Sequence, residues 1–113
     1  DPFLPKCHVE VKNVTLKRGL GENNLVEFPD SVTTRGAKHL AELSNMIAQG
    51  YRSVMLYLVQ RQDSGAFTIA ADIDPAYKAA LDNAINTGVE ILCYQCTIDT
   101  KKIEVSKSLK LLI

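Results

Sequence analysis

Residues 7–16, CHVEVKNVTL, alternate β-branched with polar side chains. Because alternate side chains of a strand point the same way, this pattern predicts a strand with His8, Glu10 and Lys12 on one face and the intervening valines on the other. In magnesium-dependent nucleases such a carboxylate ligates the metal, and the lysine two residues on orients the attacking water or stabilises the pentavalent phosphate. Glu-x-Lys is also typical of a solvated sheet face with a weak surface ion pair, so the stretch alone leaves both interpretations open.

Length and composition indicate a single domain. The chain has 113 residues, of which 46% are hydrophobic, enough for a core of its own. Thirteen basic and thirteen acidic residues cancel, so the net charge gives no argument for nucleic acid. Residues 1–61 carry eight Lys or Arg against six Asp or Glu, whereas residues 62–113 carry five against seven. This small excess around Glu10 and Lys12 is compatible with a phosphate partner but does not demonstrate one.

The sequence has no membrane or leader signal. No apolar run approaches the roughly 18 residues that span a bilayer. The first residues lack a basic region followed by an apolar one. A cytoplasmic location is therefore expected.

The first predicted helix is marked by its ends. Thr33 or Thr34 caps it, it runs to about Gln49, and Gly50 follows where a left-handed residue commonly ends a helix. Free amides and nearby bases at a helix N-terminus would suit a phosphate, although a capped helix with ordinary charged turns explains the same residues equally well. The bases in question are Arg35, Lys38 and His39.

A second helix is predicted where Asp74 stands as N-cap and Pro75 at the first helical position, and it ends at Gly88. We assign this helix a role in packing and no chemistry.

Between the helices, the apolar residues of 53–60 predict a strand covered on both faces at the sheet centre. The remaining segments are an extended lead-in at 1–6, a loop or hairpin tip at 17–24, a short strand at 25–28, a short strand or extended connection at 66–70, a strand at 89–97, and one or two edge strands within 103–113.

Cys93 and Cys96 form a Cys-x-x-Cys motif inside a predicted strand. Residues three apart on a strand point to opposite faces, so the pair is badly placed to bind zinc or to form a disulfide. We expect buried structural thiols in a reducing compartment. The order of elements as a whole predicts an α/β sandwich, a mixed β-sheet flanked by helices.

Four motifs occur in order along the chain: CHVEVKNVTL at 7–16, FPDSVTTRG at 28–36, YLVQRQD at 57–63 and IDP at 73–75. Together they resemble the sugar fermentation stimulation protein A family over almost the whole chain. That family joins an N-terminal oligonucleotide-binding-type barrel to a C-terminal domain of the restriction-endonuclease-like fold, a three-layer sandwich. The resemblance implies that residues 1–113 are this second domain, a fragment without the barrel and the first core strand.

The resemblance also implies a function. It implies a bacterial or archaeal protein that binds DNA non-specifically and takes part in the regulation of transcription and maltose metabolism. Because fold does not fix function, two alternatives stay open: a metal-dependent DNA endonuclease in the full-length protein, and a structural module without chemistry. No organic cofactor is expected.

Carried over by position, Glu10 would ligate Mg²⁺ or Mn²⁺, the Val11 carbonyl would be a further ligand, and Lys12 would be the catalytic lysine. The nuclease pattern also needs an aspartate on the preceding strand, which this sequence does not include, so the 113-residue chain is expected to bind metal weakly and not to cleave DNA. Further candidates for nucleic-acid or supporting contacts are Asp30, Arg35, Gln60 and Asp63, together with Lys17 and Arg18, for which solvated loop charge is the alternative.

Overall fold

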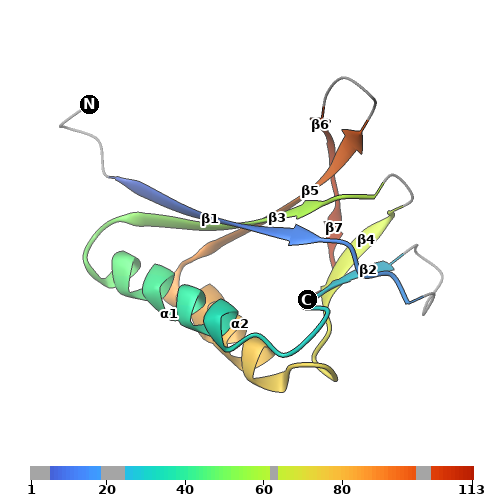
Figure 1. Ribbon diagram of the computed structural model, residues 1–113. Helices are drawn as coiled ribbons and strands as arrows, with labels where there is room; N and C mark the ends of the chain where they lie inside the picture. Colours follow the sequence, from blue (N-terminus) through green and yellow to red (C-terminus); the bar gives the residue numbers. More distant parts are fainter. Residues whose placement is uncertain (1–5, 19–24, 62–63, 99–102) are drawn as a thin grey trace.

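The computed structural model describes residues 6–18, 25–61, 64–98 and 103–113 (Figure 1). Its elements are β1 (Cys7–Val14), β2 (Leu25–Phe28), α1 (Thr34–Ala48), β3 (Arg52–Val59), β4 (Ala66–Ile69), α2 (Pro75–Thr87), β5 (Glu90–Ile98), β6 (Ile103–Ser108) and β7 (Lys110–Leu111). Outside the described residues lie residues 1–5 of the predicted lead-in, most of the predicted loop at 17–24, and Asp63.

The larger sheet has the strand order β1-β3-β5-β6. Strands β1, β3 and β5 run parallel, and β6 returns antiparallel to β5, so the sheet is mixed as predicted. Strand β3 has a hydrogen-bonded neighbour on each side, which confirms its predicted central place. A helix joins each consecutive pair of parallel strands, as parallel connections require.

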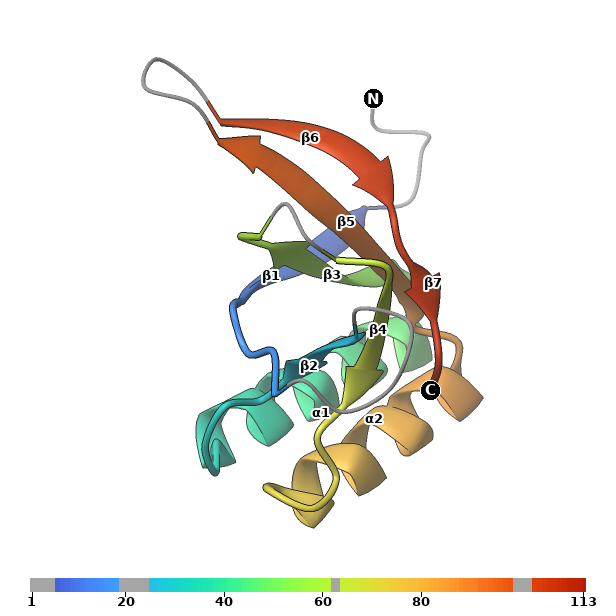
Figure 2. The same ribbon diagram turned by 90° about the vertical axis from the view of Figure 1, so that its right-hand side faces the viewer.

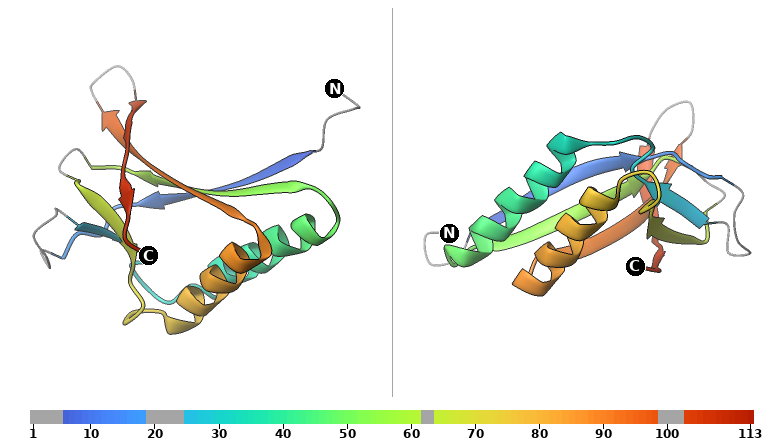
Figure 3. Two further views of the ribbon diagram at one scale, coloured as in Figure 1. Left: turned by 180° about the vertical axis from the view of Figure 1, so that it is seen from behind. Right: turned by 90° about the horizontal axis from the view of Figure 1, so that it is seen from below.

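Helices α1 and α2 lie side by side on one face of this sheet (Figures 1 and 3). The core fills the space between them, with fully buried side chains from both layers. Tyr57 of β3 and Tyr77 of α2 are both 0% exposed, and their hydroxyl oxygens lie 2.5 Å apart. Other members of the core are Val14, Leu40, Leu43, Met55, Phe67, Leu81 and Ala84.

The helix ends follow the predicted signals. Thr33 is the N-cap of α1, because its Oγ1 accepts a hydrogen bond from Gly36 N at 3.0 Å. Asp74 caps α2 in the same way, accepting from Tyr77 N at 3.0 Å. Gly88 ends α2 with a φ of 116°, a conformation that L side chains rarely adopt. The caps therefore fix where each helix begins relative to the sheet.

A second sheet is present that the sequence does not predict. It has the order β2-β4-β7 with parallel neighbours, and it lies beside the carboxyl ends of β1 and β3 (Figure 2). The sequence pattern instead suggests that these short strands lie in or beside a single mixed sheet. The division into two sheets depends on pairing between strands far apart in the sequence. One of these strands, β7, has only two residues, too few for a recognisable strand pattern.

The face of the larger sheet opposite the helices is apolar and open within the part of the chain that the structure describes. The register places Val11, Leu56 and Leu92 in one row across β1, β3 and β5. Val9 is 53% exposed, Val11 46% and Leu92 40%. We call this surface the outer face.

The two cysteines of the Cys-x-x-Cys motif are free and buried in β5, as expected. Burial raises the pKa of Cys93 to about 12. A register shift between Gln95 and Cys96 interrupts the regular alternation from which opposite orientations are expected. Because both side chains are buried, the two cysteines are packing groups in the folded chain.

Candidate functional site

The polar face of β1 is turned towards α1. Along this strand the exposed and partly buried residues alternate, with His8, Glu10 and Lys12 the partly buried ones. His39 of α1 contacts both Glu10 and Lys12, so these side chains share the side of the sheet that the helices cover. The alternation predicted from the sequence is confirmed.

Glu10, Lys12 and His39 form a compact cluster. Lys12 Nζ lies 2.7 Å from His39 Nδ1 and 3.4 Å from Glu10 Oε1. The same His39 Nδ1 lies 3.1 Å from Glu10 Oε1. The side chains are 34% exposed for Glu10, 16% for Lys12 and 19% for His39, so the carboxylate is the group most open to solvent.

Helix α1 also brings Arg35 to this cluster. Its Nε lies 3.5 Å from His39 Nε2, and the two residues are four positions apart, on one face of the helix. The sequence places His39 among the bases near the helix N-terminus but not beside Glu10. Its spacing from Arg35 is the signal that groups them, whereas the contact with β1 depends on how the helix packs.

A pocket of about 170 Å³ adjoins the cluster between β1 and α1. The ring of His8 packs against Tyr51, with 5.5 Å between centroids. His8 Nε2 is buried and has no hydrogen-bond partner among the described residues. The pocket is lined by His8, Val9, Glu10, His39, Glu42, Leu43 and Met46.

The donor set of the described residues does not make a complete metal site. Among them, no group of three or more His, Cys, Asp or Glu side chains is arranged to hold an ion. Mg²⁺ needs near-octahedral oxygen coordination and commonly takes one or two carboxylates with water. Glu10 supplies one carboxylate, which contacts nitrogen atoms of Lys12 and His39.

Two further candidates in the described segments make no hydrogen bond or ion pair with this cluster. The amide of Gln60 donates to Asn13 Oδ1 at 3.2 Å, and Asn13 alternates with Lys12 along β1, so this pair belongs to the opposite side of the strand. Asp30 is exposed in the segment between β2 and α1. Neither residue pairs with Lys12.

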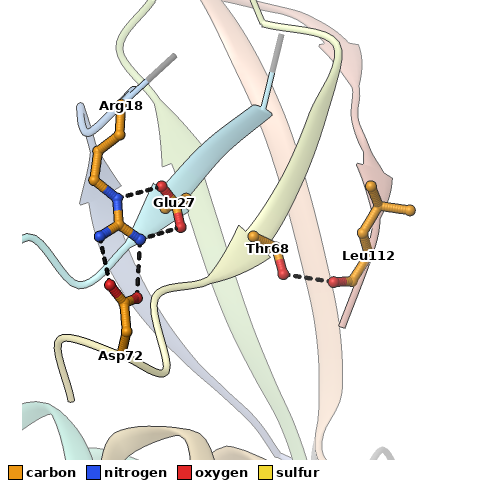
Figure 4. A network of polar contacts seen from close by, with 5 residues as sticks. All are labelled: Arg18, Glu27, Thr68, Asp72 and Leu112. Atoms are coloured by element: carbon orange, nitrogen blue, oxygen red, sulfur yellow. Dashed lines mark hydrogen bonds and ion pairs between the residues drawn. The ribbon is translucent and has the colours of Figure 1, made fainter. Parts of the chain in front are cut away.

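Arg18 is engaged in a network of its own. Its guanidinium donates to both carboxylate oxygens of Glu27 at 2.7 and 2.6 Å, and to those of Asp72 at 2.7 and 2.9 Å (Figure 4). Glu27 is buried in β2. These bonds raise the pKa of Arg18 and lower that of Asp72. Arg18 therefore ties the end of the first strand segment to β2 and to the turn before α2, while Lys17 has interactions of its own.

Fold and cluster together define an α/β domain of the restriction-endonuclease-like class. A family model described as "Sugar fermentation stimulation protein RE domain" matches residues 2–102. The chain therefore belongs to the sugar fermentation stimulation protein family.

No helix in the described segments is long and apolar enough to cross a membrane.

Curated relatives agree with this assignment. The chain is 59% identical over 98 residues to a sugar fermentation stimulation protein homolog of Rhodospirillum rubrum, covering 87% of this chain and 40% of the relative. It is 54% identical over 109 residues to the homolog of Dinoroseobacter shibae, covering 96% and 43%. The chain thus spans less than half the length of these relatives.

A solved structure shares the fold. It is described as the structure of Pyrococcus furiosus SfsA in complex with Ca²⁺. The likeness has a TM-score of 0.83 at 24% identity and covers 95% of this chain and 45% of that one.

Proposed function

We propose that this chain is a DNA-associated, nuclease-like domain whose working surface is the Glu10–Lys12–His39 cluster. The observation that carries the proposal is the meeting of a carboxylate and an ammonium group 3.4 Å apart on β1, beside a helix that adds His39 and Arg35. Lys12 and Arg35 are suited to contact a DNA phosphate, because phosphate contacts are made chiefly by such cations. Such phosphate contacts carry no sequence information, so the binding we propose is non-specific.

We further propose that Glu10 ligates a divalent cation in the full-length protein. Glu10 is the one carboxylate of the cluster and its most exposed side chain, and Mg²⁺, Mn²⁺ and Ca²⁺ all bind carboxylate oxygens. The Pyrococcus furiosus structure is a complex with Ca²⁺, which supports a cation site in a related protein. The missing oxygen ligands would come from the rest of the full-length chain, because the described residues supply a single carboxylate beside Lys12. Such a cation would polarise a phosphate oxygen or a bound water.

The rest of the full-length protein is proposed as the partner that covers the outer face. Relatives extend beyond the matched region by more than half of their length. Apolar side chains such as Val9, Val11 and Leu92 are stabilised when another surface removes them from water. A covering element there would also lie next to β1, the strand that carries Glu10 and Lys12.

A role for the full-length protein in maltose metabolism and transcription regulation is proposed from the family resemblance alone. Two alternatives are tested together with it: a metal-dependent endonuclease, favoured by the adjacent Glu10 and Lys12, and a structural module without DNA binding.

Gel-shift titrations of the full-length protein with duplex DNA test the proposal. Lys12→Met should weaken binding and lower the salt dependence of log K by about 0.9, the loss of one phosphate contact. Lys78→Met is the matched control, since Lys78 pairs with Asp82 on the surface of α2. Equal affinities for wild type and Lys12→Met would contradict the proposal. Plasmid nicking with Mn²⁺, abolished by Glu10→Gln, would distinguish the endonuclease from a binding module.

A further inference from the structure

We infer that His39 is a positioning residue that holds the ammonium group of Lys12 through Nδ1, so that Lys12 keeps its place when Glu10 turns to a cation. The importance of this for the site rests on the proposed function. The contact itself does not, and it is testable without any activity.

The geometry selects Lys12 as the partner of His39. A lysine ammonium has only donors, so the 2.7 Å contact between Lys12 Nζ and His39 Nδ1 requires Nδ1 to accept. An accepting Nδ1 cannot also donate to Glu10 Oε1, which lies 3.1 Å away. The other ring nitrogen, Nε2, faces Arg35 Nε at 3.5 Å, too far for a normal hydrogen bond, so the 2.7 Å contact decides which nitrogen accepts. In neutral His39 the ring proton is therefore placed on Nε2.

Glu10 is the weaker of the two partners of Lys12. The 3.4 Å separation between Lys12 Nζ and Glu10 Oε1 is longer than a normal hydrogen bond, whereas the contact with His39 is within the usual range. Removing the carboxylate would leave the shorter contact in place. Removing the imidazole would leave Lys12 with the longer one.

Lys12 and His39 both lie on elements that pack against the core. Lys12 lies opposite Tyr57 in the β1–β3 register, and Tyr57 is fully buried. His39 precedes Leu40, whose side chain is 0% exposed in the core, on a helix whose start is fixed by the Thr33 cap. The acceptor therefore approaches the ammonium group at a fixed place.

This arrangement has a consequence for the proposed cation site. A cation bound by Glu10 repels the neighbouring ammonium, and a lysine side chain has many alternative rotamers. With His39 as acceptor, Lys12 stays beside the cation without depending on the carboxylate. His39 thus keeps the lysine in reach of a phosphate held at the same place.

Lysine ¹⁵Nζ spectra of the full-length protein test the inference, because an ammonium group held in a hydrogen bond exchanges its protons slowly enough to be detected. The Lys12 signal is assigned by its loss in Lys12→Met. We expect the Lys12 signal in the wild type and in Glu10→Gln. We also expect it in His39→Asn, because the asparagine Oδ1 takes the place of Nδ1. In His39→Leu we expect the Lys12 signal to be lost. Lys78, whose Nζ lies 2.6 Å from Asp82 Oδ1, is the internal control and keeps its signal throughout.

A Lys12 signal that survives in His39→Leu, or that disappears in Glu10→Gln, would overturn the inference. If His39→Leu does not fold, the ring ¹⁵N shifts of neutral His39 in the wild type decide instead: a proton on Nε2 is expected, and a proton on Nδ1 would overturn it. Calcium titration of the same samples separates the two proposals. Absence of Ca²⁺ binding would contradict the cation site at Glu10, while the Lys12 signal would still decide the role of His39.

Discussion

Glu10 and Lys12 are held in place by different means, although they share one strand face. Lys12 is only 16% exposed and has an acceptor on α1, whereas Glu10 is 34% exposed and contacts nitrogen atoms only at distances of 3.1 Å and above. A carboxylate with such loose contacts is available to a ligand. Its contribution to folding should accordingly be small.

Glu10→Gln should therefore change the free energy of unfolding by no more than about 0.5 kcal/mol, because weakly paired, partly exposed charges contribute little. Urea unfolding of the full-length protein measures it. Leu81→Ala, at a fully buried core position, is the positive control and should cost about 2–5 kcal/mol. A loss of several kcal/mol in Glu10→Gln would make Glu10 a structural residue and remove it from the site.

At this scale the sequence predicted the shared face of His8, Glu10 and Lys12, because strand alternation is a local property. It also predicted Thr33 as one of two possible N-caps of α1. It did not predict the contact between His39 and Lys12, which are 27 residues apart and meet only through the packing of α1 on β1. For the same reason it did not anticipate the engagement of Arg18 by Glu27 and Asp72.

Among the elements, the two helix N-termini share one carboxylate. Asp74 Oδ1 accepts from Tyr77 N at 3.0 Å as the cap of α2, and Oδ2 accepts from Thr33 N at 2.8 Å, just before α1. Asp74 is 3% exposed. It therefore joins the start of the helix that carries His39 to the neighbouring helix.

Asp74→Ala should destabilise the protein by about 2 kcal/mol, since it removes an N-cap and leaves a second backbone amide without its acceptor. Asp74→Asn should cost less, because its Oδ1 can still cap α2. Thermal unfolding of the full-length variants measures both. Equal stability of Asp74→Ala and wild type would show that the helix starts are fixed by packing alone.

The bonds of Arg18 to Glu27 and Asp72 join the second sheet to the turn before α2. They also make the free energy of unfolding depend on pH in the acid range. Hydrogen bonding to Arg18 is the main reason why the pKa of Asp72 lies below its ordinary value of 3.8. A depressed carboxyl pKa contributes stability that is present above 3.8 and is lost as the pH falls through the lower folded-state value.

Asp72→Asn should therefore flatten the fall in unfolding free energy below about pH 4, because the unfolded-state carboxyl titrates near there. Arg18→Met should flatten it in the same way and also lower stability at neutral pH, where it leaves Glu27 buried without its cation. Urea unfolding across the acid range measures both variants. Parallel curves for wild type and Asp72→Asn would contradict this account.

The elements themselves were largely predictable, because helix caps, left-handed glycines and apolar runs are local signals. The division into two sheets was not. The pairing of β2 with β4 and of β4 with β7 joins segments separated by whole helices, and Leu112 N reaches Phe67 O at 2.8 Å with no sequence pattern to indicate it (Figure 4 shows the neighbouring bond from Thr68 to Leu112). The sequence pattern of a strand does not indicate which distant strand it pairs with.

For the whole molecule, the outer face is an open apolar surface of the described residues. If the rest of the full-length protein covers it, a cysteine introduced there should react slowly with maleimide. In a Cys7→Ser background, Val9→Cys should label more slowly than Asn83→Cys on the exposed surface of α2. Peptide mapping by mass spectrometry measures each rate, and equal rates at the two positions would show that the outer face stays open.

The proposed cation site combines Glu10 with ligands from outside these 113 residues. Calorimetric titration of Mg²⁺ and Ca²⁺ into the full-length protein tests it most directly, with Glu10→Gln as the variant and Asp82→Asn, an exposed carboxylate of α2, as the matched control. We predict binding by wild type and Asp82→Asn, a loss of more than about tenfold in Glu10→Gln, and only weak binding by the 113-residue chain. Undiminished affinity in Glu10→Gln, or tight Glu10-dependent binding by the 113-residue chain alone, would contradict the claim.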